Sequence, residues 1–157
     1  MAEAGDKPPS ANLPGSVLFA CTHNAIRSPM TMALMRYLHG KRIYADSVGL
    51  RTLPVDPFAV SVLDEIGIDL SHHQPKTFDQ LEDDFFDLVV SLSPEAQHRA
   101  VEMTRTSSCE IEFWPTMDPS VATGNRDMRL DAYRSLRDQL LERLQKRFPL
   151  PGGPVMT

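Results

Sequence analysis

The sequence has only two cysteines, Cys21 and Cys109, and no long hydrophobic run. Two thiols are too few for a disulfide framework or a cysteine-rich metal site. The longest apolar stretches, such as Ser16 to Ala20, are far shorter than the roughly 20 residues that cross a bilayer, so we expect no membrane interaction. The first fifteen residues also lack the basic start and apolar run of a signal peptide. The sequence therefore predicts a cytoplasmic protein whose cysteines stay reduced.

An excess of basic residues is also missing, because 16 lysines and arginines face 21 acidic residues and give a formal net charge of −5. Nucleic-acid binding through phosphates is therefore not expected. The chain of 157 residues, 41% of them hydrophobic, suits one globular domain with its own core. We expect that domain at residues 16–148, with disordered tails at residues 1–15 and 149–157. No cofactor or metal is predicted, and a monomer or weak dimer is expected.

Short apolar runs alternate with segments of helical periodicity through the whole predicted domain. Strands are predicted at Ser16–Ala20, Ile43–Val48, Phe85–Leu92 and Cys109–Trp114. Helices are predicted from Pro29, with Ser28 as N-cap, to Gly40, from Asp56 to Gly67, from Pro94 to about Thr104, and from about Arg126 to Arg147. This alternation predicts an α/β fold with three layers, a doubly wound four-stranded parallel sheet. Ligands of such sheets bind at the carboxyl ends of the strands, and both Cys21 and Asp118 follow predicted strands.

A thiol and a guanidinium lie six positions apart in the segment Cys21-Thr22-His23-Asn24-Ala25-Ile26-Arg27-Ser28, between a predicted strand and a predicted helix. A loop of this length can turn its backbone N–H groups inward beside the positive end of the helix dipole, which predicts an anion-binding loop after the first strand. Arg27 would hold two phosphoryl oxygens with its planar fork. The same positive field favours a Cys21 thiolate, to which Ser28 could donate a hydrogen bond. Asn24 suits such a turn because it tolerates positive φ.

The stretch Cys21 to Pro29, with the strand Val17-Leu18-Phe19 before it, resembles the low-molecular-weight protein tyrosine phosphatase family. The resemblance continues at Asp46-Ser47, at Ile66 to Ser71 and at Asp118-Pro119, and it covers about residues 16–148. It implies an enzyme that hydrolyses phosphotyrosine in proteins, or small aryl phosphate monoesters, through a cysteinyl-phosphate intermediate. Phosphate and other tetrahedral oxyanions would be ligands of the same loop.

The resemblance also implies a role for each site residue. Cys21 would be the nucleophile, Arg27 the phosphate clamp and Asp118 the general acid that protonates the leaving group. The remaining loop residues would bind the substrate or shape the loop, and these are Thr22, His23, Asn24, Ala25, Ile26 and Ser28. Ser47 would be either a buried hydrogen-bond donor behind the loop or a plain strand-end residue. No metal is implied, because Arg27 and the backbone donors hold the charge.

The chain departs from the family pattern at several positions. His23 stands where the family usually has glycine, which its tolerance of positive φ would allow, and Ile26 replaces a second cysteine. Ser120 and Val121 follow Asp118-Pro119, where phosphatases often carry aromatic residues. These changes leave the preference for a phosphotyrosine ring open.

Two alternatives to a phosphatase stay open. The related thioredoxin-coupled arsenate reductases share the fold and loop, and the segment from Glu112 to Pro119 resembles their last strand and loop. Such reductases relay a disulfide through further thiols, and none follows Ser93 at the matching positions, so this alternative requires an external thiol. The other alternative is a non-catalytic module that binds phosphate or a phosphorylated partner.

Three further features have simpler readings. The pair His72-His73 follows Ser71 without cysteines or clustered acids nearby, so we expect a loop with one packed histidine and no metal site. Trp114 is predicted in the core, and Cys109 is predicted to be buried on the fourth strand.

Overall fold

The structure, a computed structural model, describes residues 13–82 and 85–150. Most of the two predicted tails lies outside these residues. Contacts of the domain begin before residue 16, because Leu13 packs against the core and the Gly15 N–H donates to Asp87 Oδ2 over 2.7 Å. Within the described ranges, no helix combines the length and apolar character needed to cross a membrane.

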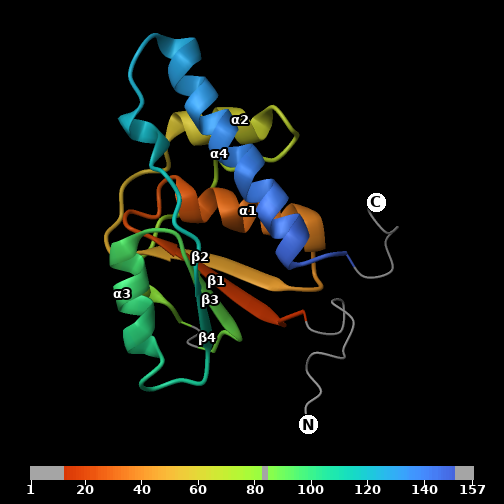
Figure 1. The fold of residues 1–157 in the computed structure, drawn as a ribbon, viewed down its shortest axis with the longest axis vertical. Coiled ribbons are helices and arrows are strands. Elements are labelled where there is room, and N and C mark those ends of the chain that lie inside the picture. The colour runs from red at the N-terminus through yellow and green to blue at the C-terminus, as the bar shows by residue number, and fades with distance from the viewer. Residues whose placement is uncertain (1–12, 83–84, 151–157) are drawn as a thin grey trace.

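The sheet has four parallel strands in the order β2-β1-β3-β4 (Figure 1). Their bounds are β1 (Ser16–Cys21), β2 (Tyr44–Gly49), β3 (Leu88–Ser91) and β4 (Glu110–Phe113). Cys21 at the end of β1 pairs with Gly49 at the end of β2, and Ala20 pairs with Ser91 at the end of β3. The carboxyl ends of three neighbouring strands therefore meet at one edge of the sheet.

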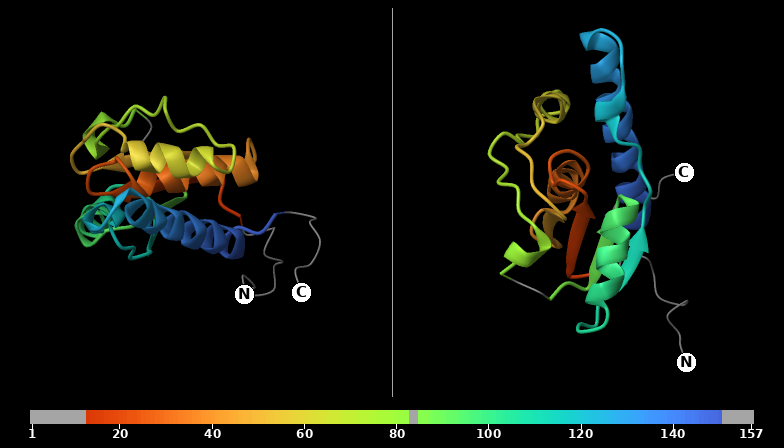
Figure 2. Two further views of the ribbon diagram at one scale, coloured as in Figure 1. Left: turned by 90° about the horizontal axis from the view of Figure 1, so that it is seen from above. Right: turned by 90° about the vertical axis from the view of Figure 1, so that its left-hand side faces the viewer.

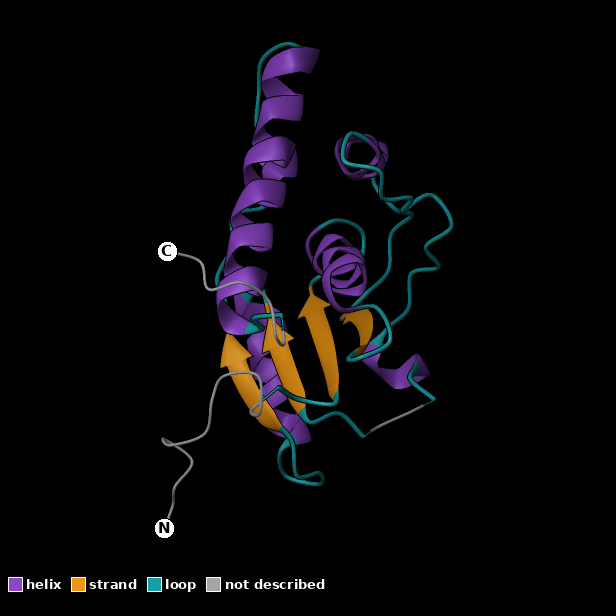
Figure 3. Cartoon of the chain, turned by 90° about the vertical axis from the view of Figure 1, so that its right-hand side faces the viewer, coloured by secondary structure: helices purple, strands orange, loops and turns teal. Residues whose placement is uncertain are grey.

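Helices cover both faces of this sheet, as predicted, so the fold is a three-layer α/β arrangement (Figures 1 and 3). The helices are α1 (Arg27–His39), α2 (Pro57–Asp64), α3 (Pro94–Met103) and α4 (Arg126–Arg147), with two 3-10 turns, η3 (Phe78–Gln80) and η4 (Pro119–Val121). Successive residues of β1 point to opposite faces. Val17 and Phe19 enter the larger core under α1 and α4, whereas Leu18 and Ala20 enter the smaller core under α3.

Several predicted boundaries differ from the observed ones by one to three residues. Helix α1 begins at Arg27 with Ile26 as N-cap, so the predicted N-cap at Ser28 is wrong. The Ser28 hydroxyl lies inside the helix start and bonds to the Cys21 sulfur and the Val48 carbonyl instead. The short helix α2 ends at Asp64, because the chain already turns before Gly67, which has a φ of 83°.

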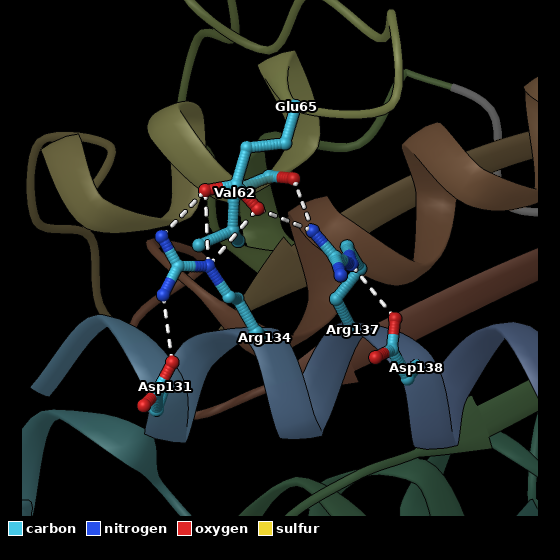
Figure 4. Close-up of polar contacts among 6 residues, drawn as sticks. All are labelled: Val62, Glu65, Asp131, Arg134, Arg137 and Asp138. Atoms are coloured by element: carbon cyan, nitrogen blue, oxygen red, sulfur yellow. Dashed lines mark hydrogen bonds and ion pairs between the residues drawn. The ribbon is translucent and has the colours of Figure 1, made fainter. Parts of the chain in front are cut away.

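The long helix α4 runs beside α1 and α2 (Figure 2), and a cluster of charges ties it to the end of α2. Glu65 accepts hydrogen bonds of 2.8 Å from both Arg134 and Arg137 (Figure 4). These bonds, that from Arg134 foremost, lower the pKa of Glu65, although burial acts in the opposite direction. Asp131 and Asp138 pair with the same arginines from within α4.

Substituting Glu65→Gln is expected to lower the free energy of unfolding at pH 7 by about 1 kcal/mol, because the Glu65 side chain is 37% exposed and its ion pairs are partly screened by water. The folded-state pKa of Glu65 lies below its unfolded value. The contribution is therefore complete above the unfolded pKa and disappears as the pH falls through the folded pKa. Urea unfolding of the wild type and the variant, at pH 7 and at a series of lower pH values, measures the loss of stability and its decline with pH.

The matched control is Glu142→Gln, which removes an exposed pair with Lys146 and should change stability little. Equal losses for the two variants at pH 7, or a Glu65→Gln loss that does not shrink as the pH is lowered, would contradict this account of the α2–α4 contact.

Candidate active site

The loop between β1 and α1 curls around Asn24, which is fully buried and has a φ of 53°. Among the described non-glycine residues, Asn24 is the one at positive φ, so the loop closes without a positive φ at His23. The Asn24 amide donates to Ser28 Oγ over 2.9 Å and to Ser47 Oγ over 3.0 Å. Its Oδ1 accepts from the Lys76 N–H over 2.9 Å. Asn24 therefore fixes the loop from inside. Ser47 is buried and contacts the loop, but its hydroxyl accepts this hydrogen bond, whereas one of the two readings had it as a donor.

The Cys21 sulfur lies at the end of β1 and is 2% exposed. It is 3.0 Å from Ser28 Oγ and 3.4 Å from the backbone nitrogen of Ser28. Ser28 lies in the first turn of α1. Both groups can donate to a thiolate, and the helix N-terminus adds a favourable field. The Ser28 hydroxyl and N–H therefore orient the Cys21 sulfur at the start of the loop.

Arg27 is the first residue of α1, and its guanidinium reaches across to the loops after β3 and β4. Its Nη1 donates to the Thr116 carbonyl over 3.0 Å and makes a longer contact of 3.5 Å with the Leu92 carbonyl. These contacts hold the planar fork beside the loop while its other nitrogens remain available to an anion.

A cavity of about 230 Å³ brings Cys21, Arg27 and Asp118 together. Asp118 precedes η4, and its Oδ1 accepts hydrogen bonds from the Ser120 N–H over 2.9 Å and the Ser120 hydroxyl over 2.7 Å. Those bonds fix the orientation of the carboxyl group. The wall is completed by residues from the loop and from the segment before α2, namely His23, Ala25, Ile26, Leu53, Pro54 and Asp56.

Three of the predicted substrate-binding residues, Thr22, Asn24 and Ser28, do not line this cavity, and the side chain of Thr22 turns toward α3 instead. Its hydroxyl donates to Ser93 Oγ over 3.0 Å and lies 3.4 Å from Glu95 at the start of α3. Ser93 is the N-cap of that helix. Thr22 thus anchors the loop to α3.

Residues from distant segments also support the loop, and two of them escape prediction from sequence. The ring of His73 lies 3.1 Å from Asn24 Oδ1 and 3.2 Å from the Asn24 carbonyl. Burial lowers the pKa of His73. A side chain built on Gly49 would come within 2.6 Å of the Asn24 nitrogen, so only glycine fits there. No local sequence pattern predicts that His73 or Gly49 contacts Asn24. The more general expectation of one packed histidine in this segment is confirmed.

Asp56 is a second carboxylate of the cavity wall, although its sequence context indicates only the start of a helix. It caps α2 by accepting from the Phe58 N–H over 2.8 Å, and its other oxygen accepts from the Tyr133 hydroxyl over 2.8 Å. Burial raises the pKa of Tyr133, and the negative charges of Asp56 and Asp118 raise it further. Tyr133 is therefore a permanent donor that ties α4 to the cavity.

The remaining chemically interesting residues lie away from the cavity. Trp114 is in the core, as predicted. Cys109 is only partly buried and precedes β4 at the amino end of the sheet, so the prediction of a buried strand position is wrong. That end is about 16 Å from the Cys21 end, at about 3.3 Å per residue of β1.

Across the described ranges, no group of three or more His, Cys, Asp or Glu side chains is placed to hold a metal ion.

Comparison with known proteins agrees with this arrangement. The family model described as low molecular weight phosphotyrosine protein phosphatase matches residues 16–147. A curated relative, the glutaredoxin arsenate reductase of Synechocystis sp., is 28% identical over 82% of this chain and 92% of its own length. An arsenate reductase of Halalkalibacterium halodurans is 32% identical over 82% of this chain and 91% of its own.

Solved structures include both kinds of enzyme. The low molecular weight protein tyrosine phosphatase of T. tengcongensis superposes with a TM-score of 0.69 at 26% identity, covering 83% of this chain and 95% of that one. Proteins with this fold thus include both tyrosine phosphatases and arsenate reductases.

Proposed function

Because the chain belongs to the low molecular weight phosphotyrosine protein phosphatase family, we propose that it is a cysteine-dependent hydrolase of phosphotyrosine or small aryl phosphate monoesters. The observation that carries the proposal is one cavity lined by a sulfur with two donors, a guanidinium and a carboxyl group. Those groups supply a nucleophile, a phosphate clamp and an acid. No further side chain is needed for a two-step displacement.

In the first step the Cys21 thiolate attacks phosphorus and the bond from phosphorus to the ester oxygen breaks. Asp118 gives its proton to the departing oxygen, so an alcohol or phenol leaves rather than an anion. In the second step Asp118 takes a proton from water, which attacks the cysteinyl phosphate and releases inorganic phosphate. Arg27 and the inward N–H groups of the loop balance the phosphoryl charge in both steps.

Arsenate reduction is the second candidate, and the names of the curated relatives favour it. Reduction of arsenate to arsenite takes two electrons, which a pair of thiols supplies as it becomes a disulfide. Cys21 is one thiol of such a pair. Cys109 is at the opposite edge of the sheet, so the second thiol would have to come from another molecule, such as glutathione or glutaredoxin.

The wild-type protein distinguishes these candidates. We expect it to release para-nitrophenol from para-nitrophenyl phosphate, and to show at most weak reduction of arsenate with glutathione, glutaredoxin or thioredoxin. Absorbance of para-nitrophenol and thiol-coupled oxidation of NADPH measure the two rates.

Arsenate reduction without ester turnover would reverse this ranking. Phosphate binding with neither activity would identify the chain as the non-catalytic module instead. Phosphate binding itself is followed by the rise in melting temperature that a ligand of the folded state produces.

A further inference from the structure

A second cavity, of about 550 Å³, lies on the side of α1 that faces the chain segment between α2 and η3. In Figures 2 and 3 this segment leaves α2 and passes beside α1 before it reaches η3. The cavity shares none of its lining residues with the one that contains Cys21. One wall is apolar and is formed by Met32, Ala33, Tyr37, Ile68 and Leu70. A flat hydrocarbon group would find a matching surface there, and the exposed Tyr37 ring offers a stacking partner.

Two cations and two carboxylates line this cavity, and Arg36 is the cation that no carboxylate contacts within the described residues. Asp46 is bound by Lys76 at 2.6 Å, and Asp69 is bound by Ser71 and faces His72 at 3.4 Å. Arg36 donates from Nε and Nη2 to the Ala45 carbonyl, and no carboxylate among the described residues pairs with it. The carbonyl contact fixes the guanidinium in place while its charge remains for an anion to satisfy.

The cavity also borders the catalytic loop through His73. This ring lines the cavity and lies 3.1 Å from Asn24 Oδ1, and the neighbouring Lys76 N–H donates to the same oxygen. Asn24 in turn donates to Ser28 Oγ, which is 3.0 Å from the Cys21 sulfur. A ligand that presses on His73 therefore acts on the hydrogen bonds that orient Ser28 toward the sulfur.

We infer that this cavity binds a small aromatic carboxylate, with its carboxylate on Arg36 and its ring against Tyr37 and Ile68, and that occupancy changes the reactivity of Cys21 through His73 and Asn24. The ligand needs both an aromatic ring and a negative charge to bind, because the apolar wall and the Arg36 guanidinium lie in the same cavity. The link to Cys21 reactivity rests on the proposed function, whereas binding does not. The site is thus regulatory and separate from the substrate cavity.

The binding test uses the full-length ¹⁵N-labelled protein, saturated with inorganic phosphate so that the catalytic loop is filled, and titrated with 2-naphthoate. We expect amide shifts at residues 32–37 and 67–76, and no comparable shifts with the neutral 2-naphthamide. Arg36→Gln should weaken binding at least about tenfold, the loss expected for one charge-assisted hydrogen bond. Tyr37→Ser, at an exposed position, should weaken it as well. Arg42→Gln is the matched control, because Arg42 bonds to the Leu38 carbonyl and does not line the cavity.

The coupling test measures alkylation of Cys21 by iodoacetamide in a Cys109→Ser background, without phosphate. Saturating 2-naphthoate should change that rate at least about twofold, and the change should disappear in Arg36→Gln. Shifts confined to residues 21–28, or binding that Arg36→Gln leaves intact, would overturn the site. Binding without any change in alkylation would overturn the coupling. Because neither readout requires ester turnover, failure of the proposed hydrolase activity is recognised separately.

Discussion

Cys21→Ser is expected to lower kcat/KM for para-nitrophenyl phosphate by at least about 10⁴-fold, because a hydroxyl in this loop stays protonated and is a poor nucleophile. The sulfur of Cys21 is the one thiol among the residues that line the cavity with Arg27. The substitution is nearly isosteric, and Arg27 and the loop N–H groups remain. Phosphate should therefore still raise the melting temperature of the variant, which separates loss of chemistry from loss of binding.

The chain provides a matched control for this result in Cys109→Ser. Cys109 lies at the amino end of the sheet, away from the cavity, so its replacement should leave kcat/KM within about twofold of the wild-type value. Residual turnover by Cys21→Ser close to that of the wild type would mean that the ester is cleaved by another group, and the proposed mechanism would fall.

Asp118→Asn is expected to lower kcat by about 10² to 10⁴-fold, the usual contribution of a general acid. The asparagine Oδ1 can still accept from the Ser120 N–H and hydroxyl, so the loop before η4 should keep its shape. The loss should depend on the ester. Phenyl phosphate, whose leaving group needs the proton most, should lose the most, and esters of acidic phenols should lose the least.

A series of aryl phosphates with leaving groups of graded acidity measures this dependence. Asp127→Asn is the control, since Asp127 is an exposed acid in the first turn of α4 and should leave the rates unchanged. A uniform loss across the series would assign Asp118 a structural role. The acid would then have to be sought elsewhere in the cavity wall, where Asp56 is the other carboxylate.

The sequence is sufficient to predict the layers and the position of the candidate site. Alternation of strand and helix patterns predicts a parallel sheet, and the carboxyl ends of parallel strands meet at one edge. Cys21 and Asp118, which are far apart in the chain, are therefore expected together, and they line one cavity. Their catalytic roles remain proposals for the variants above to test.

The supports of the loop are the part that sequence patterns do not predict. His73 and Gly49 contact Asn24 from segments whose positions depend on the packing of the whole fold. No periodicity or spacing reports such contacts. Ser28 shows the reverse case, because its residue type and position favour an N-cap, yet its hydroxyl is directed to Cys21 and the helix begins earlier. At Ser28 the tertiary contact with Cys21 therefore decides the position of the hydroxyl, and the local N-cap preference does not.

The distance between the two cysteines has a consequence for damage by peroxide. A sulfenic acid formed at Cys21 would ordinarily be trapped by a neighbouring thiol as a reversible disulfide. The position next to Arg27 is Ile26, and Cys109 sits at the far end of the sheet. The chain therefore holds no partner that could shield this sulfur from further, irreversible oxygen addition. Recovery of the thiol from the sulfenic acid therefore depends on a reductant that diffuses in from solution before a second oxygen is added.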